Sequence, residues 1–137
     1  MKKNEFHFTI IGRQTWEEIL ELIKDFNEKK RSEILQKIEE LWKNTQWNIE
    51  LKNEFYYIKK DYKDPETPDI RESIIQIAEI DKITELYQKL NLLLNTQFET
   101  PLLHVTLYTN STRAEKKLYW IGIYSKKQFN KLETKKI

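Results

Sequence analysis

The spacing of hydrophobic and polar residues changes several times along the chain, and each change marks the start of an expected helix or strand. Over residues 5–12 apolar and polar positions alternate, which predicts a strand. Over residues 15–27, and again from Ser32, apolar positions recur every three or four residues, which predicts two amphipathic helices. Thr15 is followed three residues later by Glu18, a capping box that would open the first helix. The expected order therefore begins with one strand and two helices.

Alternation returns in the middle of the chain. Residues 47–51 and 55–62 alternate and are rich in aromatic side chains, so we expect a hairpin that turns at Asn53 and Glu54. Residues 63–69 contain two prolines and no apolar anchor, which is typical of a mobile loop.

The second half of the chain contains further strands and helices. Residues 71–80 are apolar at nearly every position, as in a strand buried on both faces. Asp81 is expected to cap a helix whose apolar stripe reaches Leu94. Five more features follow: a link over residues 95–101, a strand containing His104, a strand over residues 118–124, a short helix opened by a capping box at Ser125, and a frayed tail from Glu133.

The two histidines of the sequence stand in the same frame, His-x-Thr followed by an aliphatic residue. The two copies are His7 with Thr9 and His104 with Thr106. Side chains two apart on a strand point to the same face, so each copy would present an imidazole and a hydroxyl together. By the same alternation, Tyr108 is expected on the face of His104 and Thr106. Two such strands would line a cleft with two imidazoles and two hydroxyls.

These groups suit phosphodiester chemistry. A neutral imidazole accepts a proton near pH 7 while a charged one donates a proton, and hydroxyls can hydrogen-bond the phosphoryl oxygens. Such chemistry requires no metal, and two histidines lack a clear third ligand for one. For either copy alone, a hydrogen-bonded structural histidine or a threonine chosen for its strand propensity is the commoner explanation. The repetition favours a site.

The paired motif resembles the two-histidine (2H) phosphoesterase superfamily, which includes 2′-5′ RNA ligase-like proteins, cyclic phosphodiesterases and viral anti-defence nucleases. The resemblance implies an α+β, bilobal fold with antiparallel sheets around a central cleft and helices packed outside. It also implies one domain over residues 1–137, and a hydrolase in which His7, Thr9, His104 and Thr106 are catalytic. Relatives carry a strand and a helix before the first motif. Residues 118–124 and the helix after them would take that place, or one lobe is trimmed.

The substrate implied by the resemblance is a small nucleotide or oligonucleotide: a 2′,3′-cyclic phosphate, a 2′-5′ linkage or a cyclic oligonucleotide messenger. One histidine would act as general base and the other as general acid, with the assignment open. Two alternatives have the same residues. One is a binding module that captures a nucleotide or RNA end without turnover, and the other is a 2′-5′ RNA ligase.

Five residues are candidates for substrate binding. Arg13 and Arg71 could attract phosphates, although most exposed arginines are merely solvated. Tyr57 and Trp120 could stack on bases, against the commoner alternative of core packing. Tyr108 is the best single candidate, although relatives often carry a basic residue near its place.

Composition agrees with a soluble globular chain of one domain. The 137 residues are 39% hydrophobic and 34% charged, and the net charge of +2 is too small for a general nucleic-acid binder. There is no cysteine, which excludes disulfides and thiolate sites. No apolar run approaches a membrane span or a signal peptide, so we expect a cytoplasmic protein with no membrane contact, no cofactor and no obligate protein partner.

Overall fold

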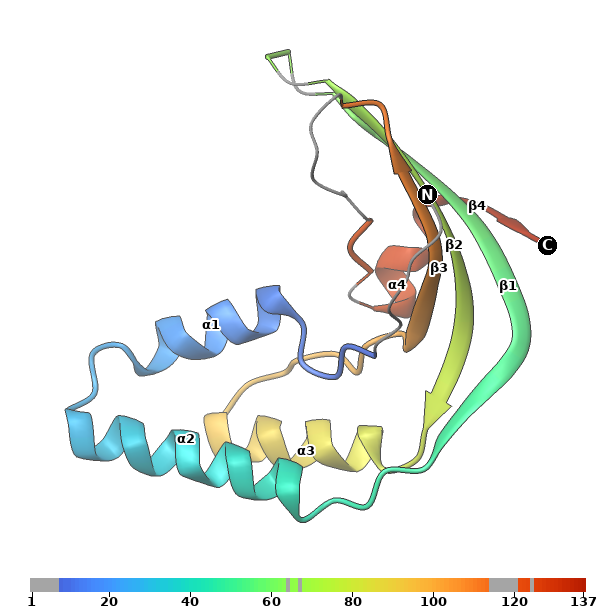
Figure 1. Cartoon of the computed structure of the whole chain (residues 1–137). Coiled ribbons are helices and arrows are strands. Elements are labelled where there is room, and N and C mark those ends of the chain that lie inside the picture. Colours follow the sequence, from blue (N-terminus) through green and yellow to red (C-terminus); the bar gives the residue numbers. More distant parts are fainter. Residues whose placement is uncertain (1–7, 64, 67, 114–120, 124) are drawn as a thin grey trace. The chain divides into compact units, whose positions relative to one another are not determined.

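The computed structural model describes residues 8–63, 65–66, 68–113, 121–123 and 125–137 (Figure 1). The chain divides into two compact units. The sheet unit takes its described residues from the ranges Met1–Thr9, Glu50–Glu79 and Pro101–Ile137, and the helical unit consists of Ile10–Ile49 and Ile80–Thr100. No helix within the described residues has the length and apolar character of a membrane span.

The helical unit contains three helices, α1 (Arg13–Ile23), α2 (Glu28–Lys43) and α3 (Ile83–Leu94). Each helix contributes one side chain to a buried cluster, because their apolar stripes face one another. The cluster consists of Ile19 from α1, Ile38 from α2 and Leu90 from α3, with Ile11, Ile34, Leu93, Leu94 and Phe98 packed around it. The buried hydroxyl of Tyr87 donates a hydrogen bond to the carbonyl of Ile10 at 2.5 Å, which ties the segment before α1 to α3.

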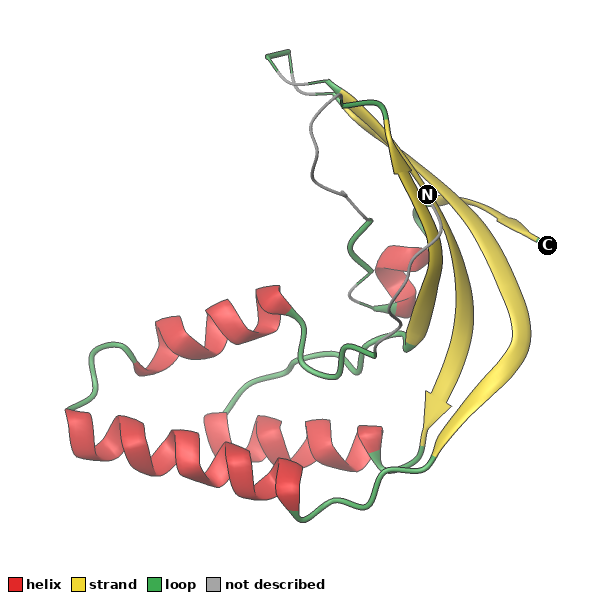
Figure 2. Cartoon of the chain, viewed as in Figure 1, coloured by secondary structure: helices red, strands yellow, loops and turns green. Residues whose placement is uncertain are grey.

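The sheet unit contains four strands and one short helix (Figure 2). The strands are β1 (Ile49–Tyr62), β2 (Asp69–Ile80), β3 (His104–Ser111) and β4 (Glu133–Lys136), in the spatial order β3-β2-β1-β4. β3 pairs antiparallel with β2, and β4 pairs antiparallel with β1. The α+β class and an antiparallel sheet are therefore confirmed, whereas the bilobal phosphoesterase arrangement remains a prediction.

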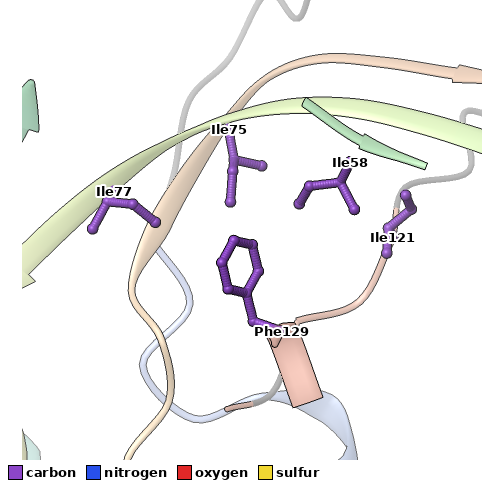
Figure 3. Packing of buried hydrophobic residues seen from close by; sticks show 5 residues of the cluster. All are labelled: Ile58, Ile75, Ile77, Ile121 and Phe129. Atoms are coloured by element: carbon purple, nitrogen blue, oxygen red, sulfur yellow. The ribbon is translucent and has the colours of Figure 1, made fainter. Parts of the chain in front are cut away.

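One face of this sheet is covered by helix α4 (Lys126–Phe129), and we call it the α4 face. Ser125 opens α4 as predicted, since its hydroxyl accepts from the backbone N–H of Gln128 at 3.1 Å. Phe129 then points at the sheet, and its ring meets Tyr56 edge-on with centroids 5.2 Å apart. The buried cluster between helix and sheet consists of Ile58, Ile75, Ile77, Ile121 and Phe129 (Figure 3).

Three strand predictions are wrong within the described residues. Residues 8–12 form no strand, because the Ile10 carbonyl is bonded by Tyr87 and Gly12 already caps α1. Asn53 and Glu54 form no turn: they lie inside the continuous fourteen-residue strand β1. Residues 121–123 form no strand either, and residues 118–120 and 124 lie outside the described part.

The expected frayed tail from Glu133 is also wrong, because Glu133–Lys136 form β4. Its four residues pair with Tyr56, Tyr57, Ile58 and Lys59 of β1. All four side chains are exposed, so β4 is held by backbone pairing. Short, lysine-rich strands are typical of sheet edges, and their polar sequence hides them from a hydrophobicity pattern.

Helix boundaries differ from the expected ones. α1 begins before Thr15, with Gly12 as N-cap and no side-chain cap, so the predicted capping box lies inside the helix. α2 begins at Glu28, before Ser32, where the Asn27 side chain accepts from the N–H of Lys30 at 2.8 Å.

The start of α3 is the third difference from the expected boundaries. α3 is preceded by Lys82 at φ 62°, whereas Asp81, the expected cap, accepts hydrogen bonds from the backbone N–H and the side chain of Asn48 at 2.9 and 2.8 Å. The carboxylate of Asp81 therefore joins the segment before β1 to the start of α3.

Candidate functional site

The second motif lies at the start of β3, next to β2. His104 pairs with Ile77, and Thr106 pairs with Ile75. Directly opposed residues of antiparallel strands point to the same face. His104 and Thr106 therefore lie on the α4 face, both half-buried, beside the isoleucines of the core. The intervening Val105 is buried on the opposite face, which confirms the predicted alternation for this copy of the motif.

The imidazole of His104 is oriented by its own strand. Its Nδ1 lies 3.0 Å from the carbonyl oxygen of Leu102. A carbonyl oxygen can only accept a hydrogen bond, so Nδ1 carries the proton and donates it. In the neutral ring the lone pair then resides on Nε2, which makes Nε2 the nitrogen that takes up or releases a proton.

A β-bulge follows Thr106 and changes the alternation. The register pairs Thr106 with Ile75 but Tyr108 with Ile74, so Leu107 is the extra residue of β3. An extra residue reverses which face each later side chain points to. The prediction that Tyr108 shares a face with His104 and Thr106 is therefore wrong: Tyr108 lies on the opposite face, and Thr109 returns to the α4 face.

Tyr57 also lies on the opposite face, because its neighbour Ile58 belongs to the core on the α4 face. Its surroundings raise the pKa of the Tyr57 phenol: partial burial is the largest cause, followed by the hydrogen bond that the phenol donates to Glu72. Tyr57 and Tyr108 are thus separated from His104 by the thickness of the sheet. This placement does not support a contact of either ring with a phosphate held by His104.

Arg71 shares the α4 face with His104 but lies at the far end of the sheet. Arg71 pairs with Ser111, six positions along β2 from the pair of Ile77 with His104. At about 3.3 Å per residue, the two side chains are roughly 20 Å apart along the strand. Both cannot hold one phosphate, so Arg71 could contact only a remote part of an extended substrate.

Arg71 belongs to a buried polar network that the sequence did not reveal. Its Nε lies 2.7 Å from the carboxylate of Asp69, and its guanidinium lies 4.2 Å from the ring centroid of Tyr62. Ser111 also donates to Asp69, which is 2% exposed. Burial alone would raise the pKa of Asp69, but the hydrogen bonds from Arg71 and Ser111 and the nearby positive charge outweigh it and lower the pKa.

Two buried hydroxyl side chains lie on the α4 face between His104 and Arg71. Ser73 and Thr109 are buried, and their hydroxyl oxygens lie 3.4 Å apart. Neither was predicted, since a bulge without glycine leaves no mark in the sequence and Thr109 would otherwise be assigned to the outer face. The face of Thr109 follows only from the register with β2, in which Thr109 pairs with Ser73.

The other predicted residues fall elsewhere. His7 and Trp120 lie outside the described residues. Thr9 is exposed and belongs to no strand. Arg13 is the first residue of α1 in the helical unit, where its Nε lies 2.8 Å from Glu17 and the hydrogen bond and charge of that carboxylate raise the pKa of Arg13. The described part of the site is therefore His104 with Thr106.

Among the described residues no metal site adds to this pair, and two hollows of the described part lie in the helical unit. In the part of the chain that the structure describes, no three histidine, aspartate or glutamate side chains are grouped to hold a metal ion. The helical unit has one hollow of about 370 Å³ between α2 and α3 and another of about 430 Å³ beside α1. Their lining includes none of the predicted site residues.

Comparison of the chain with protein-family models, with curated proteins and with solved structures found no match.

Proposed function

We propose that the protein cleaves a phosphodiester bond of a small nucleotide or oligonucleotide without a metal ion, with His7 and His104 as general acid and base. The observation that carries the proposal is the hydrogen bond that orients the imidazole of His104. Its Nδ1 proton is donated to the Leu102 carbonyl at 3.0 Å, so Nε2 is the basic nitrogen of the neutral ring. This is the state that a general base needs, and the same nitrogen carries the acidic proton in the imidazolium.

Thr106 supports the proposal by its position. It lies two residues along the strand from His104 on the same face, about 7 Å away at the backbone, which is close enough for both side chains to reach one phosphate. A hydroxyl there can donate to a non-bridging oxygen as negative charge builds up on phosphorus. The first motif repeats this pair of groups, as His7 and Thr9.

In the proposed reaction one imidazole takes a proton from water or from a substrate 2′-hydroxyl, and the oxygen so formed attacks phosphorus. The second imidazole, as imidazolium, gives its proton to the leaving oxygen, so the proton count balances over one turnover. Attack by water gives hydrolysis, and attack by a 2′-hydroxyl gives a cyclic phosphate. The reverse of attack by a 2′-hydroxyl joins a cyclic phosphate to a 5′-hydroxyl through a 3′-5′ bond. The 2′-5′ ligase reaction is the reverse of the corresponding attack by a 3′-hydroxyl on a 2′-5′ linkage.

The roughly 20 Å between His104 and Arg71 favours a small substrate. A mononucleotide held at His104 and Thr106 would not reach Arg71, the one predicted binding residue that the described part of the chain places on that face. We therefore propose nucleoside 2′,3′-cyclic phosphates, 2′-5′ linked oligonucleotides and cyclic dinucleotides as the substrates to test.

The experiment is incubation with these three classes, in the presence and absence of EDTA, with products separated by chromatography. We expect cleavage that EDTA does not reduce. We expect His104→Asn to lower the rate about 10²–10⁴-fold, because an asparagine amide can still donate to Leu102 but cannot exchange a proton. Asn110→Ala, at an exposed position of the same strand, is the matched control and should keep full activity.

Two outcomes would contradict the proposal. Abolition of cleavage by EDTA would indicate a metal enzyme. Retention of ligand by the protein with no product from any of the three classes would indicate a binding module.

A further inference from the structure

The outer edge of β1 is covered over only part of its length. β4 pairs with Tyr56, Tyr57, Ile58 and Lys59, whereas β1 begins at Ile49. Among the strands that the structure describes, none pairs with the first part of β1 on this side, and Figure 1 shows this part of β1 extending beyond β4. The edge in question consists of Glu50–Asn53, all within the sheet unit.

The direction of the backbone groups at this edge follows from two hydrogen bonds. The carbonyl of Lys52 accepts from Gln76 of β2, so it points inward. The carbonyl of Phe55 accepts from the N–H of Ile137 beyond β4, so it points outward. Backbone groups of successive strand residues alternate in direction. The N–H and C=O of Leu51 and Asn53 therefore point outward, toward the open edge.

The side chains at this edge add apolar surface. Ile49 and Leu51 are 52% and 53% exposed and lie on the same side of the strand. An edge strand with outward backbone groups and exposed apolar side chains is a template for pairing with another strand, and most proteins cover or charge such edges. Here the other side of the strand carries opposite charges close together, with Lys52 Nζ 3.1 Å from Glu50 and 3.2 Å from Glu79 of β2.

We propose that this edge binds a second copy of the chain, with the two β1 strands antiparallel across a twofold axis at Leu51. In this register Leu51 faces Leu51 of the partner subunit, and Glu50 faces Lys52 of the partner subunit on both sides of the axis. The charges of the edge are thus self-complementary, as an isologous interface requires. The result is one continuous sheet of eight strands.

Neighbouring symmetric registers place like charges opposite each other. An axis at Glu50 would oppose the two Glu50 carboxylates. An axis at Lys52 would oppose the two ammonium groups and would also set Glu50 against Glu54. Directly opposed like charges destabilise strand pairs. An axis at Asn53 would bring the partner strand against Phe55, whose carbonyl is already bonded to Ile137. Among these four registers, the charge pattern and the bonded carbonyl of Phe55 together select the axis at Leu51.

The first test is the oligomeric state of two charge variants, measured by sedimentation over a range of concentrations. The wild-type chain should dimerise as concentration rises. Glu50→Lys and Lys52→Glu should each be monomeric, because each brings like charges together in its own dimer. An equimolar mixture of the two variants should dimerise again, since both opposed pairs then have opposite charges. A wild-type chain that stays monomeric, or a mixture of the folded variants that does, would overturn the proposal.

The second test determines the register and uses the absence of cysteine from the sequence. Leu51→Cys should form a covalent dimer under mild oxidation, because directly opposed residues lie within the roughly 7 Å between Cα atoms that a disulfide allows. Asn53→Cys is the control and should not, since its counterpart lies about 14 Å away along the strand. Equal cross-linking of both variants would exclude the proposed register.

Discussion

The two units of the chain bury different kinds of side chain. The helical unit has a core of aliphatic side chains from three helices, Ile19, Ile38 and Leu90. Apart from the hydroxyl of Tyr87, the polar or charged groups that are buried among the described residues lie in the sheet unit, in Asp69, Ser73, Thr109 and Ser125. Buried polar groups are costly unless they are hydrogen-bonded, so a unit that keeps several of them must position them accurately. The sheet unit therefore holds its buried polar side chains in fixed, hydrogen-bonded positions.

Removal of one side chain from each core tests whether the two units unfold separately, and it has the largest expected effect on the free energy of unfolding. Ile75→Ala and Leu90→Ala should each cost about 2–5 kcal/mol of the free energy of unfolding, because both side chains are 1% exposed. Hydrogen exchange should show lost protection mainly in β1 and β2 for the first variant and mainly in α1 and α2 for the second. Equal loss in both units from either variant would show that the two cores open together.

Substitution of Asp69 tests how much a buried polar group contributes to the stability of the sheet unit. Asp69→Asn should cost about 1–3 kcal/mol, because the half-buried donors Arg71 and Ser111 lose a charged, buried acceptor. Since the pKa of Asp69 is lowered in the folded protein, its stabilisation is present above about pH 4 and is lost as pH falls through the folded pKa. Denaturant unfolding from pH 7 to pH 2 should therefore show a smaller acid loss for the variant. Asp61→Asn, at an exposed position of β1, is the control.

Tyr87 gives a smaller effect on the stability of the helical unit, and this effect appears at alkaline pH instead of acid pH. Burial raises the pKa of Tyr87 to about 12, so its contribution is complete below pH 10 and is lost as pH rises toward 12. Tyr87→Phe removes the hydrogen bond to Ile10 and should cost about 1 kcal/mol at neutral pH. It should also reduce the loss of stability between pH 10 and 12, measured by chemical denaturation. An unchanged alkaline loss would contradict the assignment to Tyr87.

Long periodic segments were predictable from the sequence. The three helices and the strand of the second motif each bury a face that repeats at the period of the element, and β2 is marked by a nearly continuous run of apolar residues. Both patterns are visible in the order of residues along the chain. Of the candidate site, the shared face of His104 and Thr106 was predictable, because it depends only on alternation between adjacent residues.

Features that depend on a neighbouring strand were not predictable. Asn53 and Glu54 look like a turn, yet β1 continues through them because polar side chains are tolerated where the strand is exposed. β4 has no apolar residue and exists only because β1 supplies backbone partners. The bulge at Leu107 is visible only in the register with β2, and for this reason the assignment of Tyr108 failed.

The same bulge has a consequence for protein engineering. A mutational library aimed at the His104 side of β3 by taking every second codon would vary positions 104, 106, 108 and 110, and half of those choices would alter the wrong side. The set that varies one side is 104, 106, 109 and 111. Deletion of Leu107 would exchange the two sets beyond that point, so a single lost codon in this strand would change more of the surface chemistry than most substitutions.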